Sequence, residues 1–223
     1  MAAAGAGRRA GTSSKLLRPL RGEPVLVHSV RRLNRVAAVR SIVVVARRAD
    51  VRRVRQLLAR AQLHKVRRVV AVGATRMASV RRGLSAADPR ASLILIHDAA
   101  RPLIAPRLAA RAIRAAQRCG AAIVAMPATD TVKIQRGERA GRLTTPPRHT
   151  VWMAQTPQVF RSALIRRAYA AAARARVGVT DDAAAVERLG RRVAVVPGDA
   201  TNLKITWPAD FAVAAALLNG HRR

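Results

Sequence analysis

The stretch SLILIHDAARPL, residues 92–103, runs from an apolar strand pattern directly into polar side chains. A carboxylate at the carboxyl end of a buried strand, beside the small residues Ala99 and Ala100 that let a ligand come close, can hold Mg²⁺ against phosphate oxygens. Asp98 is therefore a candidate metal ligand. The alternative is that Asp98 caps the following turn and pairs with Arg101 on the surface.

Short β-branched runs elsewhere in the chain alternate with longer Ala, Arg and Leu segments of helical period. This alternation, with strands that are apolar along most of their length, predicts an α/β fold with a doubly wound, mostly parallel sheet covered on both faces. Ligands of such sheets bind beyond the carboxyl ends of the strands. The predicted strands are 41–46, 66–72, 92–97, 121–126 and 191–196, and the predicted helices lie near 24–34, 50–62, 76–87, 106–118, 161–175 and 208–218.

The chain has 223 residues and is half apolar, which suits a single domain over residues 1–223. No apolar stretch approaches the roughly 20 residues of a membrane span, and the N-terminus lacks the apolar core of a signal peptide. We therefore expect a cytoplasmic protein with no membrane contact.

The net charge of +32 invites a nucleic-acid interpretation, but the arginines are spread over nearly every segment and aromatic residues make up only 2 % of the chain. We expect no specific nucleic-acid partner, because base recognition needs a localised basic surface and stacking side chains. The spacing of four arginines in the helix near 106–118 predicts a solvated helix face instead. These are Arg107, Arg111, Arg114 and Arg118.

Residues 133–155, KIQRGERAGRLTTPPRHTVWMAQ, have no helical period. Two extended pieces flank a tip of Gly, Arg and Glu, which indicates a protruding β-hairpin arm. A monomer would not need such an arm, so we expect it to serve dimerisation.

The first fifteen residues, MAAAGAGRRAGTSSK, place Gly5 and Gly7 ahead of Arg9 and Lys15. Glycines at this spacing let the backbone approach phosphates while the cations face them. Such a loop normally follows a buried strand, which is central in a doubly wound sheet. Only Met1 to Ala4 precede the first glycine, so we expect either about four to six apolar residues upstream or a short stub of strand.

Lysine is rare among the 43 basic residues. A lysine that is retained where the composition favours arginine indicates a position that requires a compact point charge. The four are Lys15, Lys65, Lys133 and Lys204.

Eight motifs in this order and spacing resemble those of the 2-C-methyl-D-erythritol 4-phosphate cytidylyltransferase family. The resemblance implies a Rossmann-like sheet of nucleotidyltransferase type and a Mg²⁺-dependent homodimeric enzyme of the non-mevalonate isoprenoid pathway. It would join CTP to 2-C-methyl-D-erythritol 4-phosphate, giving 4-diphosphocytidyl-2-C-methyl-D-erythritol and pyrophosphate. The alternatives are the related ribitol-5-phosphate cytidylyltransferase and a non-catalytic, basic polyanion-binding protein on the same fold. The motifs are AAAGAGRR (2–9), HSV (28–30), GATRMASVRRGL (73–84), HDAARPL (97–103), DTVK (130–133), QTPQ (155–158), TDDAAAVE (180–187) and NLKIT (202–206).

The resemblance also implies roles for single residues. Residues implied to line the nucleotide are Ala3, Ala4, Gly5, Gly7, Gly73, Ser79, Asp98 and Ala99, with Asp98 as the Mg²⁺ ligand. Residues implied to surround the methylerythritol phosphate are Arg101, Thr131, Thr156 and Thr180. The catalytic set implied by the family is Arg9, Lys15, Arg148 and Lys204, of which Arg148 on the arm would reach the neighbouring subunit's substrate.

Overall fold

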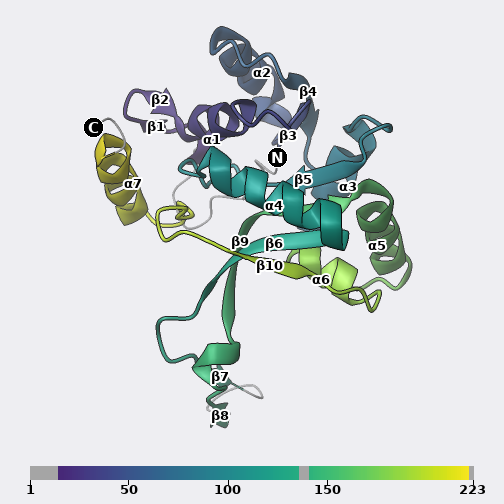
Figure 1. The fold of residues 1–223 in the computed structure, drawn as a ribbon. Coiled ribbons are helices and arrows are strands. Elements are labelled where there is room, and N and C mark those ends of the chain that lie inside the picture. The colour runs from purple at the N-terminus through teal and green to yellow at the C-terminus, as the bar shows by residue number, and fades with distance from the viewer. Residues whose placement is uncertain (1–14, 136–140, 221–223) are drawn as a thin grey trace.

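The computed structural model describes residues 15–135 and 141–220 (Figure 1). A four-stranded sheet has the order β10 (Ala194–Pro197), β6 (Ala121–Pro127), β9 (Trp152–Arg161) and β5 (Leu93–Ile96). β6 and β10 are parallel, whereas β9 runs antiparallel to both of its neighbours. A second sheet pairs β3 (Ile42–Ala46) with β4 (Val66–Ala71) in parallel. Two short hairpins pair β1 (Pro19–Leu20) with β2 (Glu23–Pro24) and β7 (Ile134–Gln135) with β8 (Leu143–Thr144).

The predicted helices and strands are confirmed, with small shifts at their ends. The long helices are α1 (Val25–Asn34), α2 (Val51–Arg60), α3 (Arg76–Ala86), α4 (Pro106–Cys119), α5 (Ser162–Arg174) and α7 (Ala209–Gly220). One short helix, α6 (Asp182–Glu187), was not predicted. Single 3₁₀ turns occur at η1 (Lys15–Leu17), η2 (Arg48–Asp50) and η3 (Arg148–Thr150).

Helix α4 shows why the local sequence adopts this structure. Pro106 occupies its first turn, where its fixed φ suits a helix start, and Gly120 ends it at φ +84°, a left-handed conformation that glycine adopts without strain. Leu108, Ala112 and Ile113 are buried, while the four arginines of the helix are exposed. The predicted solvated arginine face is confirmed.

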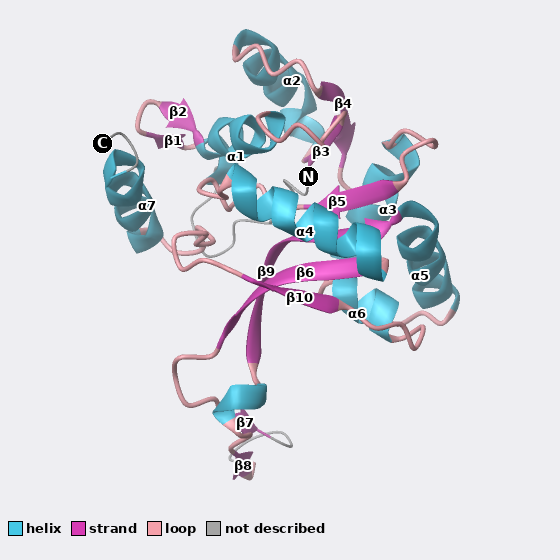
Figure 2. Ribbon diagram, viewed as in Figure 1, coloured by secondary structure: helices cyan, strands magenta, loops and turns pink. Residues whose placement is uncertain are grey.

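Helices cover both faces of the four-stranded sheet, as Figure 2 shows, with α4 on one face and α5 and α6 on the other. Two clusters of buried residues lie on these two faces. In β9, the neighbours Val159 and Phe160 belong to different clusters because successive strand residues point to opposite faces. This coverage explains why β6 is apolar along most of its length. The α/β class is confirmed, and the chain contributes helices to both sides of the sheet.

Strand β9 was not predicted as a strand of the main sheet. It lies between β5 and β6, with Gln158 opposite Ile96 of β5 and also opposite Ile123 of β6. Its first residues, Trp152 to Gln155, fall inside the predicted arm, so one strand belongs to both the arm and the sheet. Figure 1 shows the arm leaving the body, with β7 and β8 at its far end.

The glycine-rich loop and the strand expected before it lie outside the described residues and stay predictions. Over the two described ranges, no helix has the length and apolar character that crossing a membrane requires.

Candidate active site

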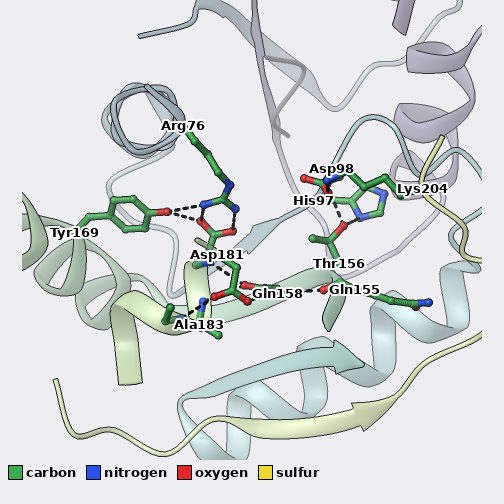
Figure 3. A network of polar contacts seen from close by, with 12 residues as sticks. Arg76, His97, Asp98, Gln155, Thr156, Gln158, Tyr169, Asp181, Ala183 and Lys204 are labelled. Atoms are coloured by element: carbon green, nitrogen blue, oxygen red, sulfur yellow. Dashed lines mark hydrogen bonds and ion pairs between the residues drawn. The ribbon is translucent and has the colours of Figure 1, made fainter. Parts of the chain in front are cut away.

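Polar segments that follow β4, β5 and β10 meet β9 and the start of α6 in one region of the molecule. Figure 3 shows its two groups of side chains. Asp98, Lys204, His97 and Thr156 form one group, and Arg76 and Tyr169 point toward one another in the other. Gln158 of β9 lies between the groups. The carboxyl ends of β5 and β10 supply the charged groups of the first one, as the sheet rule predicts.

The ion pair between Asp98 and Lys204 is the charged centre of the first group, with Lys204 Nζ 2.8 Å from Asp98 Oδ2. Burial alone raises the pKa of Asp98, but the charge and hydrogen bond of Lys204 outweigh it and hold that pKa below its ordinary value. Asp98 is therefore ionised at neutral pH. Its carboxylate faces Lys204, and the predicted role of Asp98 as a metal ligand stays a prediction.

The loop that carries Lys204 is fixed to the turn after β5 by two hydrogen bonds. The Ile205 amide donates to the Ala100 carbonyl at 2.8 Å, and Arg101 Nη1 donates to the Asn202 carbonyl at 2.7 Å. Asn202 Nδ2 in turn donates to the Thr156 carbonyl at 2.9 Å. These hydrogen bonds hold Lys204 beside Asp98, because its loop is anchored to the turn after β5 and to β9.

Arg101 is almost fully buried, with 8 % of its surface exposed. Its Nε has no hydrogen-bond partner within the described residues. A buried guanidinium with an unused donor is the kind of group that an anionic oxygen can satisfy. The contact of Arg101 with a phosphate, which the resemblance implied, stays a prediction.

Thr156 connects β9 to the turn after β5. Its Oγ1 lies 2.9 Å from His97 Nδ1 and 3.0 Å from the Asp98 amide nitrogen. Burial lowers the pKa of His97 to about 4, so this ring is neutral at pH 7. Its Nε2 faces the Arg101 carbonyl at 3.2 Å, which can only accept, so Nε2 carries the proton and Nδ1 accepts. The Thr156 hydroxyl consequently donates to His97 and accepts from the Asp98 amide.

The turn from Gly73 to Ser79 is shaped by small and hydroxyl side chains. A Cβ on Gly73 would lie 2.4 Å from the Cβ of Ala78, so only glycine fits there. Ser79 Oγ accepts from the Gly73 amide at 3.1 Å and donates to the Thr75 carbonyl at 2.8 Å. Thr75 caps α3 by accepting from the Ala78 amide at 3.0 Å. The structure thus brings Gly73 and Ser79 together in a turn held by its own hydrogen bonds.

The second group joins this turn to α6. Arg76, the first residue of α3, places Nη2 2.7 Å from Asp182 Oδ2, and the Tyr169 hydroxyl donates to Asp182 Oδ1. Burial lowers the pKa of Arg76, but the charge and hydrogen bonds of Asp182 outweigh this and raise it above the ordinary value. Burial and the Asp182 charge raise the pKa of Tyr169.

Gln158 and Asp181 fix the start of α6. Gln158 Oε1 accepts from the amides of Asp182 and Ala183 at 3.2 and 3.0 Å, and its Nε2 donates to Asp181 Oδ2 at 2.9 Å. Asp181 Oδ1 accepts from the Ala184 amide at 2.8 Å, which makes Asp181 the N-cap of α6. Thr180 directly precedes this anchored turn and is exposed.

The other expected site residues lie farther out or outside the described ranges. Lys15 begins η1, and Ala99 is fully buried with its carbonyl accepting from Ser29 Oγ at 2.6 Å. Thr131 is exposed beyond β6, and Arg148 on the arm donates from Nη1 to the Thr129 carbonyl at 3.1 Å. Ala3, Ala4, Gly5, Gly7 and Arg9 lie outside the described residues.

Sequence patterns assigned no role to several side chains that build this region. Gln158, Asp182 and Asn202 lie within the quoted motifs QTPQ, TDDAAAVE and NLKIT, so the motifs carried the signal. Arg76 also lies in a motif, but its partner is 106 residues away. Tyr169 lies in no motif, and its only signal is that it is the single tyrosine of the chain.

Comparison with known proteins shows which family the chain belongs to. The family model of 2-C-methyl-D-erythritol 4-phosphate cytidylyltransferase matches residues 1–220. The enzyme of that name from Acidobacterium capsulatum is 42 % identical, over 97 % of this chain and 94 % of the relative. The crystal structure of 4-diphosphocytidyl-2C-methyl-D-erythritol synthase from Anaerococcus prevotii superimposes with a TM-score of 0.84 at 32 % identity, over 94 % of this chain and 93 % of that one. The cytidylyltransferase structure from Thermus thermophilus gives a TM-score of 0.75 at 35 % identity, over 95 % and 96 % of the two chains. The chain therefore belongs to the 2-C-methyl-D-erythritol 4-phosphate cytidylyltransferase family.

Proposed function

We propose that this protein transfers the cytidylyl group of CTP to 2-C-methyl-D-erythritol 4-phosphate. An oxygen of the acceptor's phosphate forms a bond to the α-phosphorus of CTP, the bond from that phosphorus to the β-phosphate oxygen breaks, and pyrophosphate leaves with the electron pair. The observation that carries the proposal is the Asp98–Lys204 pair, anchored at the carboxyl end of β5 in a chain that matches the family model over residues 1–220.

The chemistry suits these residue types. Phosphoryl-type transfer needs in-line positioning and cations that face the developing charge, and it needs no covalent protein nucleophile. Lys204 and Arg101 supply cations for the acceptor phosphate, while Lys15 and Arg9 stabilise charge on the α-phosphate. The turn of Gly73 and Ser79 receives the cytidine.

A divalent cation, with Mg²⁺ as the expected ion, fits Asp98. The described residues contain no group of three His, Cys, Asp or Glu side chains that could hold a metal alone. One ionised carboxylate is nevertheless what Mg²⁺ uses when substrate phosphates and water complete its shell. Bound there, the ion would neutralise charge on the triphosphate. Lys204 already faces the same carboxylate and would remain beside the acceptor phosphate.

We infer that the two sheets are parts of one doubly wound, mostly parallel Rossmann-like sheet. Among the described strands β3 and β5 are not paired with each other, and side chains of both line a space of about 420 Å³. A space lined by both strands places the neighbouring edges of the two sheets next to each other, which supports one domain over residues 1–223.

We also propose that the protein is a homodimer that uses the arm over residues 133–155. The exposed large apolar side chains on the arm support this, because an interface would remove from water apolar surface that a monomer leaves exposed. They are Ile134, Leu143, Trp152 and Met153, each more than 40 % exposed. Arg148 on the same arm would then reach the partner's acceptor. Because CTP is made and used inside the cell, the proposed reaction belongs in the cytoplasm.

Pyrophosphate release tests the function. The purified protein is mixed with CTP and Mg²⁺, and release is followed with 2-C-methyl-D-erythritol 4-phosphate, with D-ribitol 5-phosphate and with no acceptor. We expect release only with the methylerythritol phosphate. Release with ribitol 5-phosphate alone would assign the related activity, and release with neither would favour a non-catalytic, polyanion-binding protein.

A further inference from the structure

Asp182 is the point at which three segments of the molecule meet. Its side chain is completely buried and accepts from both terminal nitrogens of Arg76, at 2.7 and 3.3 Å, and from the Tyr169 hydroxyl. Its own amide donates to Gln158 of β9. The start of α3, the middle of α5 and the start of α6 are therefore joined at one carboxylate.

The segments joined in this way belong to the two sides of the proposed site. Arg76 lies within the turn from Gly73 to Ser79, which is proposed to receive the nucleotide. Asp182 is two residues beyond Thr180, which is proposed to contact the acceptor. The contact between Arg76 and Asp182 is the direct link between these two turns that the described hydrogen bonds provide.

The form of this link favours a role in geometry over a role in stability. Burying an ion pair gains little net stability, because the loss of hydration offsets the attraction between the charges. A two-point guanidinium–carboxylate contact does, however, fix the angle between its two parent segments as well as their distance. Tyr169 and Gln158 further restrict Asp182 to one orientation.

We propose that Arg76 and Asp182 are positioning residues that hold the nucleotide turn (73–79) in register with the acceptor turn (180–182), so that the two substrates lie in line for transfer. This inference rests on the proposed function. Neither residue needs to touch a substrate for this role. Breaking the link allows each turn to relax separately, and both substrates then bind less well.

Three variants test the link. Asp182→Asn keeps the shape of the side chain and removes its charge, Arg76→Lys keeps the charge and removes the two-point contact, and the double variant removes both. Glu23→Gln is the matched control, because Glu23 accepts both terminal nitrogens of Arg31 in another two-point pair between β2 and α1. For each protein, KM for CTP, KM for the acceptor, kcat and Tm are measured.

We expect each single variant to raise both KM values by about 10-fold or more, equivalent to about 1.4 kcal/mol per tenfold change. The double variant should be no worse than the more affected single variant, because both changes break the same contact. Glu23→Gln should leave both KM values within about twofold of the original while lowering Tm slightly. Unchanged KM values beside a lowered Tm, or additive effects in the double variant, would overturn the proposal.

Hydrogen exchange gives a readout that does not depend on turnover. If Asp182→Asn fails to fold, Arg76→Lys replaces it, since it keeps the charge and removes the two-point contact that forms the link. In the folded variant the amides of residues 73–79 should exchange at least about 10-fold faster than in the original protein, with those of α1 unchanged. Equal exchange in the turn would overturn the proposal even if the original protein proved inactive on both acceptors, a result that would refute the proposed function separately.

Discussion

Replacing Thr156 with valine separates positioning by this residue from direct substrate contact. Thr156 is 7 % exposed, and its hydroxyl donates to His97 Nδ1 and accepts from the Asp98 amide. Valine keeps the shape of threonine and removes both hydrogen bonds. The Asp98 amide and the His97 ring nitrogen then remain buried without their partner.

The expected cost follows from these two unpaired groups. Each buried, unsatisfied polar group costs about 1–3 kcal/mol, so the pair costs about 2–6 kcal/mol of a stability of about 5–15 kcal/mol. At about 2–4 °C per kcal/mol for a chain of this size, Tm should fall by about 10 °C. Because Asp98 loses the bond that fixes its backbone, and a misplacement of about 1 Å can cost about 10²-fold in rate, kcat should fall by about that factor.

Thermal melting and pyrophosphate release measure the two effects, and Thr156→Ser is the control. Serine keeps the hydroxyl and loses one methyl group, so we expect a loss of about 1 kcal/mol and nearly normal kcat. If Thr156 instead acts by touching the acceptor, the valine variant will melt normally and show only a raised KM for that acceptor. That result would refute the proposed coupling of Thr156 to Asp98.

Three other predictions follow from named contacts. Lys15→Arg and Lys204→Arg should each lower kcat by about 10²-fold, because a planar guanidinium cannot replace the compact charge of an ammonium group beside an in-line phosphate. Lys65 donates to the Val36 carbonyl, and Lys65→Arg should leave kcat unchanged. Equal losses of kcat in all three variants would contradict this reasoning. The raised pKa of Tyr169 should keep its phenol protonated above pH 10 in the folded protein. Absorbance at 295 nm, which reports the phenolate, should therefore rise only as the protein unfolds. A titration of this absorbance near pH 10 in the folded protein would contradict the burial of Tyr169. Inactive Arg148→Ala and inactive Lys15→Ala subunits are mixed and allowed to exchange. If the arm serves the partner's site in a symmetric dimer, the mixture should regain about a quarter of full activity. No recovery despite exchange would place Arg148 in the site of its own subunit.

The parts of the fold that could be predicted from sequence are those whose pattern depends only on local burial. Strand β3 is a continuous apolar run because helices cover the sheet, and α4 separates arginines from apolar residues at the period of a helix. Strand β9 escaped prediction because Gln155, Pro157 and Gln158 interrupt its apolar pattern, and a proline argues against a central strand. Gln155 and Gln158 make hydrogen bonds that organise the site. These polar residues serve the site, and they hide the alternating apolar pattern that would have indicated a strand.

The candidate site also has a part that could be predicted from sequence and a part that could not. Asp98 and Lys204 were predicted from their motifs, but the ion pair between them depends on how the loop after β10 docks onto β5. The bond from Thr156 to His97 depends on the antiparallel register of β9 against β5, which no local pattern encodes. Arg76 and Asp182 meet across 106 residues for the same reason. The candidate residues could be named from the sequence, whereas the contacts between them could be identified only from the folded structure.

A competition between acceptors in one reaction tests the central claim most directly. The protein is given limiting CTP with Mg²⁺ and equal concentrations of 2-C-methyl-D-erythritol 4-phosphate and D-ribitol 5-phosphate, and mass spectrometry measures both cytidine diphosphate products. The ratio of the products equals the ratio of the two kcat/KM values, which is the quantity that defines specificity. We predict that 4-diphosphocytidyl-2-C-methyl-D-erythritol is the dominant product and that pyrophosphate forms in equal amount. A dominant ribitol product, or no product above that of a reaction without the protein, would contradict the account.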